Sequence, residues 1–183
     1  MNPHSENVLQ PTLDGALLTL RPLAAEDFEA LFEVAGDPLL WAQHPQPTRH
    51  QRDVFKVFFD AALASGGALV AVHKASRRLV ACSRYYNWLP DEGSVCIGYT
   101  FVGREYWGTG INRELKTLML AHAFEWVATV LFEVGPENHR SRRALEKIGA
   151  VFSHSIAPGA APRPGLVYAI DAAAAALSAL SPR

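Results

Sequence analysis

The sequence lacks a clear excess of either charge, and this limits the partners to expect. Lys and Arg together number 17, against 18 Asp and Glu. Proteins that bind nucleic acid or anionic lipid usually concentrate positive charge on one surface. The near balance therefore argues against a nucleic-acid partner and against a membrane-surface partner.

Cysteine is also scarce, with Cys82 and Cys96 the two examples. Two cysteines on different predicted strands provide neither a disulfide framework nor a zinc cluster, so we expect no metal. The N-terminal stretch has no basic region followed by an apolar core, as a secretory signal would have. No apolar run approaches the roughly 20 residues of a membrane span. We therefore expect a protein of the reducing cytoplasm without a membrane partner.

The length of 183 residues suits one domain with a sizeable core. No internal repeat and no linker divides the chain. We expect a single domain over residues 1–183, with its core over about 12–171, a flexible N-terminal lead-in over 1–11 and an alanine-rich tail over 172–183.

Hydrophobic periodicity predicts an α+β domain with a mixed sheet. The predicted order is strand, two helices, three strands, helix, strand, helix and two strands. Strands are predicted at 16–21, 68–73, 79–88, 95–102, 130–134, 151–155 and 166–170, and helices at 26–35, from Thr48 to Ser65, from Ile111 to Trp126 and at 141–148. Thr48 and Gln51 are predicted to form a capping box, and Asp171 to cap a short tail helix.

The functional interpretation depends on the stretch from Val95 to Asn112, which reads as strand, glycine loop and helix. Gly108 and Gly110 allow a tight bend and a close approach of a ligand to the backbone. The first amides of the helix from Ile111 have no partner within the helix and attract phosphate. The glycines alone are equally typical of an ordinary turn. A dinucleotide fingerprint would need a glycine in place of Arg113, and the lysine of a P-loop is absent.

A second segment, Asn138-x-x-Ser141-x-x-Ala144-Leu145-x-x-x-Gly149, follows at a suitable distance. Together with the strand and the loop Trp107–Asn112, it resembles the GNAT superfamily of N-acetyltransferases. The closer resemblance is to the RimJ/RimL-type branch, which acetylates ribosomal-protein N-termini. Arg21-Pro22-Leu23 and Val167-Tyr168-Ala169-Ile170 also resemble that branch, so the resemblance covers roughly positions 12–171.

The resemblance implies a mixed, mostly antiparallel sheet with helices on both faces and a splayed parallel strand pair that forms a wedge for CoA. It implies acetyl-CoA as co-substrate and no metal. Its cofactor-binding positions are Phe101, Val102, Trp107, Gly108, Thr109, Gly110, Ile111, Asn112, Asn138 and Ser141. The strand would pair with the pantetheine arm, and the loop amides would hold the pyrophosphate. Asn138 would bond pantetheine, and Ser141 would face the sulfur.

One departure from the family pattern leaves the general base open. Cys96 stands where many relatives carry an acidic residue, and alternation predicts that it shares a strand face with Gly98, Thr100 and Val102. The turn just before the strand offers Glu92, acting through water, as a candidate base. Its neighbour Asp91 is a second candidate, and both are equally typical of a solvated turn.

A second departure leaves the general acid open. Leu145 stands where many relatives carry a tyrosine, so Ser141 and Tyr106 become the candidate acids. The basic start of the last helix, at Arg140, Arg142 and Arg143, either meets CoA phosphates or forms a solvated face.

Four aromatic side chains and one further histidine have specific expectations. Trp41 and His44 fall in the irregular stretch 39–47, where this family often binds acceptors, and are expected to be exposed. Tyr85 and Tyr86 alternate on a strand, so one is expected in the core and one beside the acceptor. His122 lies on the apolar stripe of its helix and is expected to be a core histidine.

We expect an N-acetyltransferase in which a neutral amine attacks the thioester directly in a ternary complex. A protein α-amine has a pKa of ~7.7–8.0 and a lysine one of ~10.4, a difference worth roughly 3.4 kcal/mol at neutral pH. A chain without a well-placed carboxylate therefore favours an N-terminal α-amine. The alternatives are an acyltransferase for a polyamine, an antibiotic or an amino acid, and an inactive CoA-binding module. The expected assembly is a monomer or a homodimer.

Overall fold

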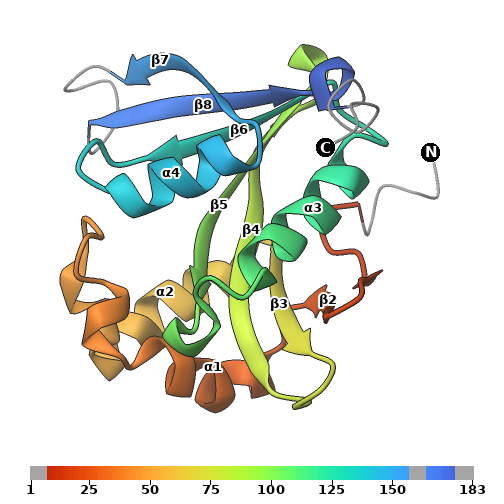
Figure 1. Ribbon diagram of the computed structural model, residues 1–183. Coiled ribbons are helices and arrows are strands. Elements are labelled where there is room, and N and C mark those ends of the chain that lie inside the picture. The colour runs from red at the N-terminus through yellow and green to blue at the C-terminus, as the bar shows by residue number, and fades with distance from the viewer. Residues whose placement is uncertain (1–7, 157–163, 176–183) are drawn as a thin grey trace.

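The computed structural model describes residues 8–156 and 164–175, which build an eight-stranded sheet (Figure 1). The strands are β1 (Leu13–Asp14), β2 (Leu18–Pro22), β3 (Ala68–His73), β4 (Leu79–Leu89), β5 (Ser94–Val102), β6 (Thr129–Val134), β7 (Val151–Ile156) and β8 (Gly165–Asp171). The helices are α1 (Phe28–Ala35), α2 (Arg52–Ala64), α3 (Ile111–Ala123) and α4 (His139–Lys147). Short 3-10 turns are η1 (Ala25–Asp27), η2 (Pro38–Leu40), η3 (Pro47–His50), η4 (Pro90–Glu92) and η5 (Arg104–Tyr106).

The strands follow the order β1-β2-β3-β4-β5-β6-β8-β7, and one neighbouring pair is parallel. That pair is β5 and β6, which are in register from Ser94–Cys96 against Thr129–Leu131. Beyond this point both strands continue, to Val102 and Val134, without pairing to each other. Figure 1 shows them diverging. The expected α+β fold with a splayed parallel pair is confirmed.

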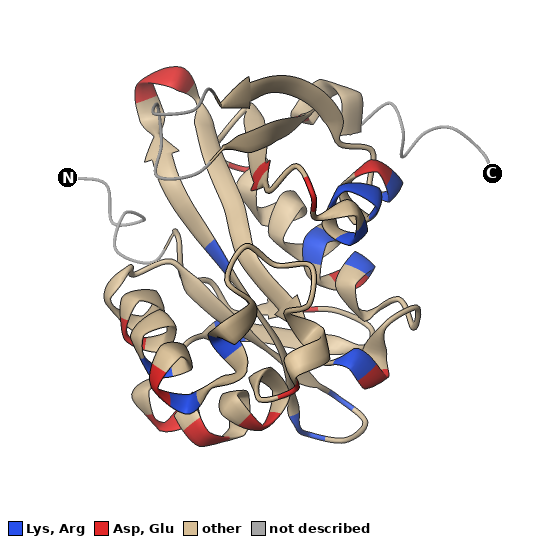
Figure 2. Cartoon of the chain, turned by 90° about the vertical axis from the view of Figure 1, so that its left-hand side faces the viewer, with Lys and Arg blue, Asp and Glu red and all other residues tan. Residues whose placement is uncertain are grey.

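Two apolar clusters cover the two faces of the sheet, as an amphipathic helix layer on each side requires. One cluster, the α3-side core, contains Leu115 and Met119 of α3 and Leu145 of α4. The other, the α1-side core, contains Leu31 of α1 and Phe55 of α2. In Figure 2 these two helix pairs lie on opposite sides of the sheet, and acidic and basic residues are interspersed over them.

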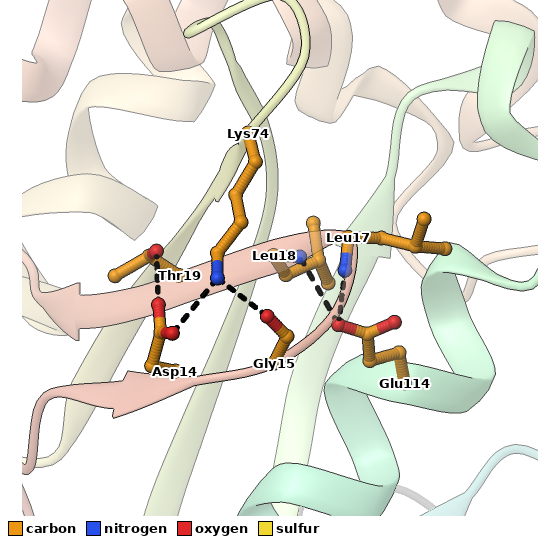
Figure 3. Close-up of polar contacts among 7 residues, drawn as sticks. All are labelled: Asp14, Gly15, Leu17, Leu18, Thr19, Lys74 and Glu114. Atoms are coloured by element: carbon orange, nitrogen blue, oxygen red, sulfur yellow. Dashed lines mark hydrogen bonds and ion pairs between the residues drawn. The ribbon is translucent and has the colours of Figure 1, made fainter.

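A polar cluster fixes the start of α3 against the first strands (Figure 3). Glu114 Oε1 accepts hydrogen bonds from the amides of Leu17, at 2.7 Å, and Leu18, at 3.0 Å. Lys74 Nζ donates to Asp14, at 2.8 Å, and to the Gly15 carbonyl, at 2.5 Å. A Cβ at Gly15 would collide with Glu114 Oε1, so a glycine is needed for this approach.

The predicted capping box at Thr48 and Gln51 is wrong. Pro47 starts a 3-10 turn that contains Thr48, and α2 begins only at Arg52. Gln51 is the N-cap in an extended conformation, without a side-chain cap. The helix predicted to run to Trp126 also ends earlier, at Ala123.

Most other element ends agree with the predicted ends within two residues. Residues 1–7 of the predicted lead-in (1–11) and residues 176–183 of the predicted tail (172–183) lie outside the described residues, as does the segment 157–163. Within the described ranges, no helix is long and apolar enough to cross a membrane.

Candidate active site

The loop between β5 and α3 presents unpaired backbone amides at the start of a helix. Gly108 has φ +79° and Gly110 has φ +92°, left-handed values that favour glycine. Gly110 is the N-cap of α3 and carries no side-chain cap, so the first amides of the helix stay open to an external acceptor. No atom lies within 4 Å of a Cβ built at either glycine. A diphosphate therefore fits this loop.

The Trp107 indole closes the end of β5. Its Nε1 donates to the Val102 carbonyl at 2.9 Å, and the residue is 40% exposed. The Arg140 guanidinium lies 4.2 Å from the centroid of that indole ring and donates from Nη2 to the Leu40 carbonyl at 2.9 Å. Arg140 thus links the start of α4 to the glycine loop and to η2. Burial lowers the pKa of its guanidinium.

Asn138 and Ser141 meet at the start of α4, on either side of Arg140, which packs on Trp107 of the glycine loop. Asn138 Oδ1 accepts from the Ser141 amide at 3.2 Å and caps the helix, and Asn138 is only 7% exposed. Among the described residues no hydrogen bond uses its Nδ2, so the amide can donate to a ligand carbonyl. A cavity of about 500 Å³ adjoins it, lined by residues 42–45, residues 135–138 and Pro164.

A β-bulge at Tyr99 changes which side chains share a face of β5. Arg84 pairs with Gly98 and Cys82 with Phe101, so two residues of β5 oppose one of β4. Tyr99 has φ +53°. The prediction that Cys96 shares a face with Thr100 and Val102 is therefore wrong, because the alternation reverses at the bulge.

The contacts of Thr100 show the reversal directly. Lys116 of α3 donates to Thr100 Oγ1 at 2.6 Å and to Ser83 Oγ at 3.4 Å, and the two hydroxyls are 2.8 Å apart. Thr100 therefore faces α3, whereas Phe101 packs in the α1-side core. Burial lowers the pKa of Lys116 to about 7.

Cys96 lies on the opposite face, near Tyr86 and the carboxylate of Glu133. Burial and then the Glu133 charge raise the pKa of the Cys96 thiol to about 11. Burial, Cys96 and Glu133 also raise the pKa of the Tyr86 hydroxyl. Glu133 follows Leu131, the last β6 residue in register with β5, by two positions and is exposed. A carboxylate thus stands beside the point where the two strands separate.

Burial raises the pKa of Cys82 to about 12. Both cysteines are therefore protonated thiols near neutral pH, and neither is a nucleophile.

Sequence reasoning did not single out Glu133. Its signal was available, because Glu133 is the one acidic residue within the apolar run of β6, Thr129–Val134. Alternation along that strand places it on the face opposite Phe132, which lies in the α3-side core.

The candidate base Glu92 lies elsewhere. It is exposed in η4, directly before Gly93, whose carbonyl accepts from Ala128 and Thr129 at the closed end of the parallel pair. The structure does not bring it to the glycine loop or to Asn138. The candidate acid Tyr106 lies against His73, with ring centroids 5.3 Å apart.

Trp41 is not exposed, contrary to the expectation. It is 2% exposed, because its Nε1 donates to the Ala35 carbonyl at 2.7 Å and its ring packs on Phe101. His44 is partly buried, and its Nδ1 accepts from the Gln46 amide at 2.9 Å.

Tyr85 is the core member of its pair, with its hydroxyl on the Met119 carbonyl at 2.6 Å, and Tyr86 occupies the other face. His122 is partly buried rather than a fully buried core residue, with its Nε2 2.8 Å from the Val8 carbonyl. Arg142 is bound to the Tyr168 hydroxyl and the Pro136 carbonyl, whereas Arg143 is exposed.

Comparisons with known proteins identify the family and the fold. The family model described as "Acetyltransferase (GNAT) domain" matches residues 18–151. A search of curated proteins found no match. A GCN5-related N-acetyltransferase from Brucella melitensis has a TM-score of 0.79 and 19% identity, covering 90% of this chain and 80% of that one.

Two further solved structures are similar. An acetyltransferase from Agrobacterium tumefaciens has a TM-score of 0.68 and 26% identity, covering 87% of this chain and 94% of that one. Mycobacterium smegmatis RimJ, solved with CoA-disulfide, has a TM-score of 0.67 and 21% identity, covering 91% of this chain and 90% of that one.

Proposed function

The chain belongs to the GNAT acetyltransferase family and is an acetyl-CoA-dependent N-acetyltransferase, and from this premise we propose that it acetylates a primary amine by direct attack within a ternary complex. We further propose the RimJ/RimL type, a protein N-terminal α-amine as acceptor and a cytoplasmic location. The resemblance of the sequence motifs to that branch supports this choice.

One observation carries the proposal: three chemically distinct parts border the same divergence of β5 and β6. The glycine loop follows the free end of β5 and offers amides to a diphosphate. Asn138 follows the free end of β6 and offers a buried amide. Glu133 stands where the strands part and offers a carboxylate to an amine. These parts suit the three parts of the reacting pair, namely diphosphate, pantetheine amide and attacking amine.

The proposed cofactor contacts follow from these parts. The amides from Gly108 to Asn112 hold the diphosphate, with Thr109 and Ile111 between them, and the edge of β5 at Phe101 and Val102 binds the pantetheine arm beside Trp107. Asn138 binds the pantetheine amide, and Ser141 faces the sulfur. Acetyl-CoA supplies the acetyl group as an activated thioester.

Glu133 replaces Glu92 as the proposed general base. It takes the proton that the amine must lose, directly or through a water. The thiol of Cys96 cannot serve, because its pKa lies near 11. Ser141 remains the proposed donor to the departing thiolate, although a thiol of pKa ~8.5 leaves tolerably without help.

A first experiment tests the cofactor site. Saturation at 100 times the dissociation constant adds about 2.7 kcal/mol, so acetyl-CoA should raise the Tm of the wild type by roughly 5–10 °C. Gly110→Trp should abolish the shift, because φ +92° and the close approach both exclude a side chain. A folded wild type that shows no shift would refute acetyl-CoA binding.

The same samples separate an enzyme from an inactive CoA-binding module. Glu133→Gln should lower kcat/KM by roughly 10²–10⁴-fold while the acetyl-CoA shift persists. Glu92→Gln, in the exposed η4 turn, is the matched control and should leave kcat/KM unchanged. Equal losses in both variants would remove the assignment of Glu133, and no turnover of any amine despite the shift would favour the module.

A further inference from the structure

Arg84 is a buried arginine that the proposed reaction does not use. It lies in the middle of β4 and is 7% exposed, and its side chain takes part in no described hydrogen bond or ion pair. Its Nε and Nη2 atoms are both buried without a hydrogen-bond partner. Burial lowers the pKa of its guanidinium, as expected for a charge removed from water without a counter-charge.

The two unpaired atoms form one edge of the guanidinium. Nε–H and Nη2–H point the same way, and this edge binds both oxygens of a carboxylate side by side. The faces of the group are packed instead: its Cζ lies 4.1 Å from the ring centroid of Tyr99 and 5.8 Å from that of Phe58. Stacking thus holds the guanidinium in place while leaving its binding edge unpaired.

Arg84 belongs to the face on which the amine is expected. It pairs in register with Gly98, directly before the bulge. Tyr86, two residues further along β4 on the same face, meets Tyr99 edge to face, with ring centroids 5.0 Å apart. The charge of Glu133 contributes to the raised pKa of the Tyr86 hydroxyl. Arg84 and Glu133 therefore place a cation and an anion on one face of the diverging strands.

We propose that Arg84 binds a carboxylate carried by the acceptor, so that the acetylated amine belongs to an acidic molecule. This rests on the proposed function. Glu133 faces the amine and Arg84 the carboxylate, which fixes the orientation of the acceptor. Tyr99 is 46% exposed and covers the guanidinium, so it must turn aside for the carboxylate to reach the edge. A polyamine is disfavoured, because Arg84 repels a second ammonium group.

Two sources supply this chemistry, and matched acceptors distinguish them. One is a free amino acid, tested as aspartate and glutamate against asparagine and glutamine. The other is a protein N-terminus, tested as peptides that begin with Asp or Glu against peptides that begin with Asn or Gln. In the source that is used, the carboxylate acceptor should exceed its amide by roughly 10–100-fold in kcat/KM, the effect of a charge-assisted hydrogen-bond pair.

Arg84→Met should abolish that preference while retaining the turnover of the amide acceptor. Arg84→Lys should restore part of it, since lysine supplies charge without the paired edge. Arg78→Met removes an exposed arginine from the turn between β3 and β4 and serves as the control, with the preference intact. Equal rates for acid and amide in the wild type, or a preference that survives Arg84→Met, would overturn the proposal.

A binding measurement separates this proposal from the proposed function. Glutarate carries carboxylates but no amine, and glutaramide is its uncharged match. Glutarate alone should raise the Tm of the CoA-saturated wild type, and Arg84→Met should remove the effect. If no amine is acetylated but this shift is present, the transferase proposal fails and the carboxylate site stands. If amines are acetylated and the shift is absent, the carboxylate site fails and the transferase proposal stands.

The stability of Arg84→Met is a further readout. If the guanidinium contributed only to packing, its removal would lower the Tm without changing the acceptor preference. An unpaired buried charge is instead expected to be replaced by methionine without loss of stability. A Tm that falls while the acid preference persists would overturn the proposal.

Discussion

At the scale of single residues, Lys116 shows how a lysine can be buried in the core. It is 5% exposed and contacts the Phe132 ring, with Nζ 5.5 Å from the centroid. Its hydrogen bonds reach Thr100 of β5 and Ser83 of β4, which face each other at the bulge. Lys116 thus ties α3 to both strands where the alternation of β5 reverses.

This lysine makes stability depend on pH in the neutral to basic range. Its pKa is about 7 in the folded protein and ~10.4 in the unfolded chain. Between these values the unfolded state binds more protons, so the free energy of unfolding should rise with pH. We expect urea unfolding from pH 7 to about 9.5 to show this rise.

Lys116→Met should flatten that rise, because methionine fills similar space and does not titrate. Lys147→Met, at the exposed end of α4, should leave it unchanged. A wild type and a Lys116→Met variant with parallel pH curves would contradict a neutral amine in the core.

At the scale of elements, α3 is held by groups that lie far away in the sequence. Its N-cap is a left-handed glycine without a side-chain cap, and its first turn is fixed by Glu114 on the amides of Leu17 and Leu18. The open amides that face the proposed diphosphate therefore depend on a contact with the first strands (Figure 3).

Glu114→Ala should lower the free energy of unfolding by about 1–3 kcal/mol, because two amides lose a charged acceptor. The corresponding fall in Tm is roughly 2–10 °C. Gly15→Ala should cost a similar amount, since its Cβ would displace the Glu114 carboxylate. Glu105→Ala, exposed in η5, is the control. A Glu114→Ala protein as stable as this control would contradict the anchoring role.

The elements themselves were largely predictable, whereas the registers between them were not. Apolar spacing identified all four helices and seven of the eight strands, because each buries one face of its own sequence. Nothing in the run from Val95 to Val102 marks the bulge at Tyr99, which arises from pairing with β4. The face of Cys96 and the burial of Trp41 by Phe101 depend on such contacts between distant segments.

The candidate site also has parts that the sequence predicts and parts that depend on contacts between distant segments. The glycine loop is local and was predicted from the sequence, whereas the role of Asn138 as the N-cap of α4 was not predicted. The proposed roles of Glu133 and Arg84 depend on β4, β5 and β6 being neighbours in space. Each is a single charged residue within a strand, and a strand pattern alone does not reveal what lies across the sheet.

At the scale of the whole molecule, two cores share one sheet, so neither helix layer is independent of the other. Phe55 is fully buried in the α1-side core and lies within ring-contact distance of Phe28, Phe58 and Phe101. Phe101 belongs to β5, the strand on which the α3-side core also packs. Loss of packing on one face should therefore lower the stability of both helix layers together.

Phe55→Ala should lower the free energy of unfolding by about 3–5 kcal/mol and leave a single transition. Urea unfolding followed by far-UV circular dichroism and by tryptophan fluorescence should give the same midpoint. Val57→Ala, on the exposed side of the same helix, should change it by no more than about 0.5 kcal/mol. Two separate transitions in Phe55→Ala would contradict a shared sheet.

The order of the strands has a consequence for how the protein folds during its synthesis on the ribosome. From β1 to β6, each strand lies beside the one made just before it, so the sheet can widen at its newest edge as the chain emerges. Pairing then stays mostly local, which speeds folding. The last step differs, because β8 enters between β6 and β7. The sheet is complete only after Asp171 has left the exit tunnel.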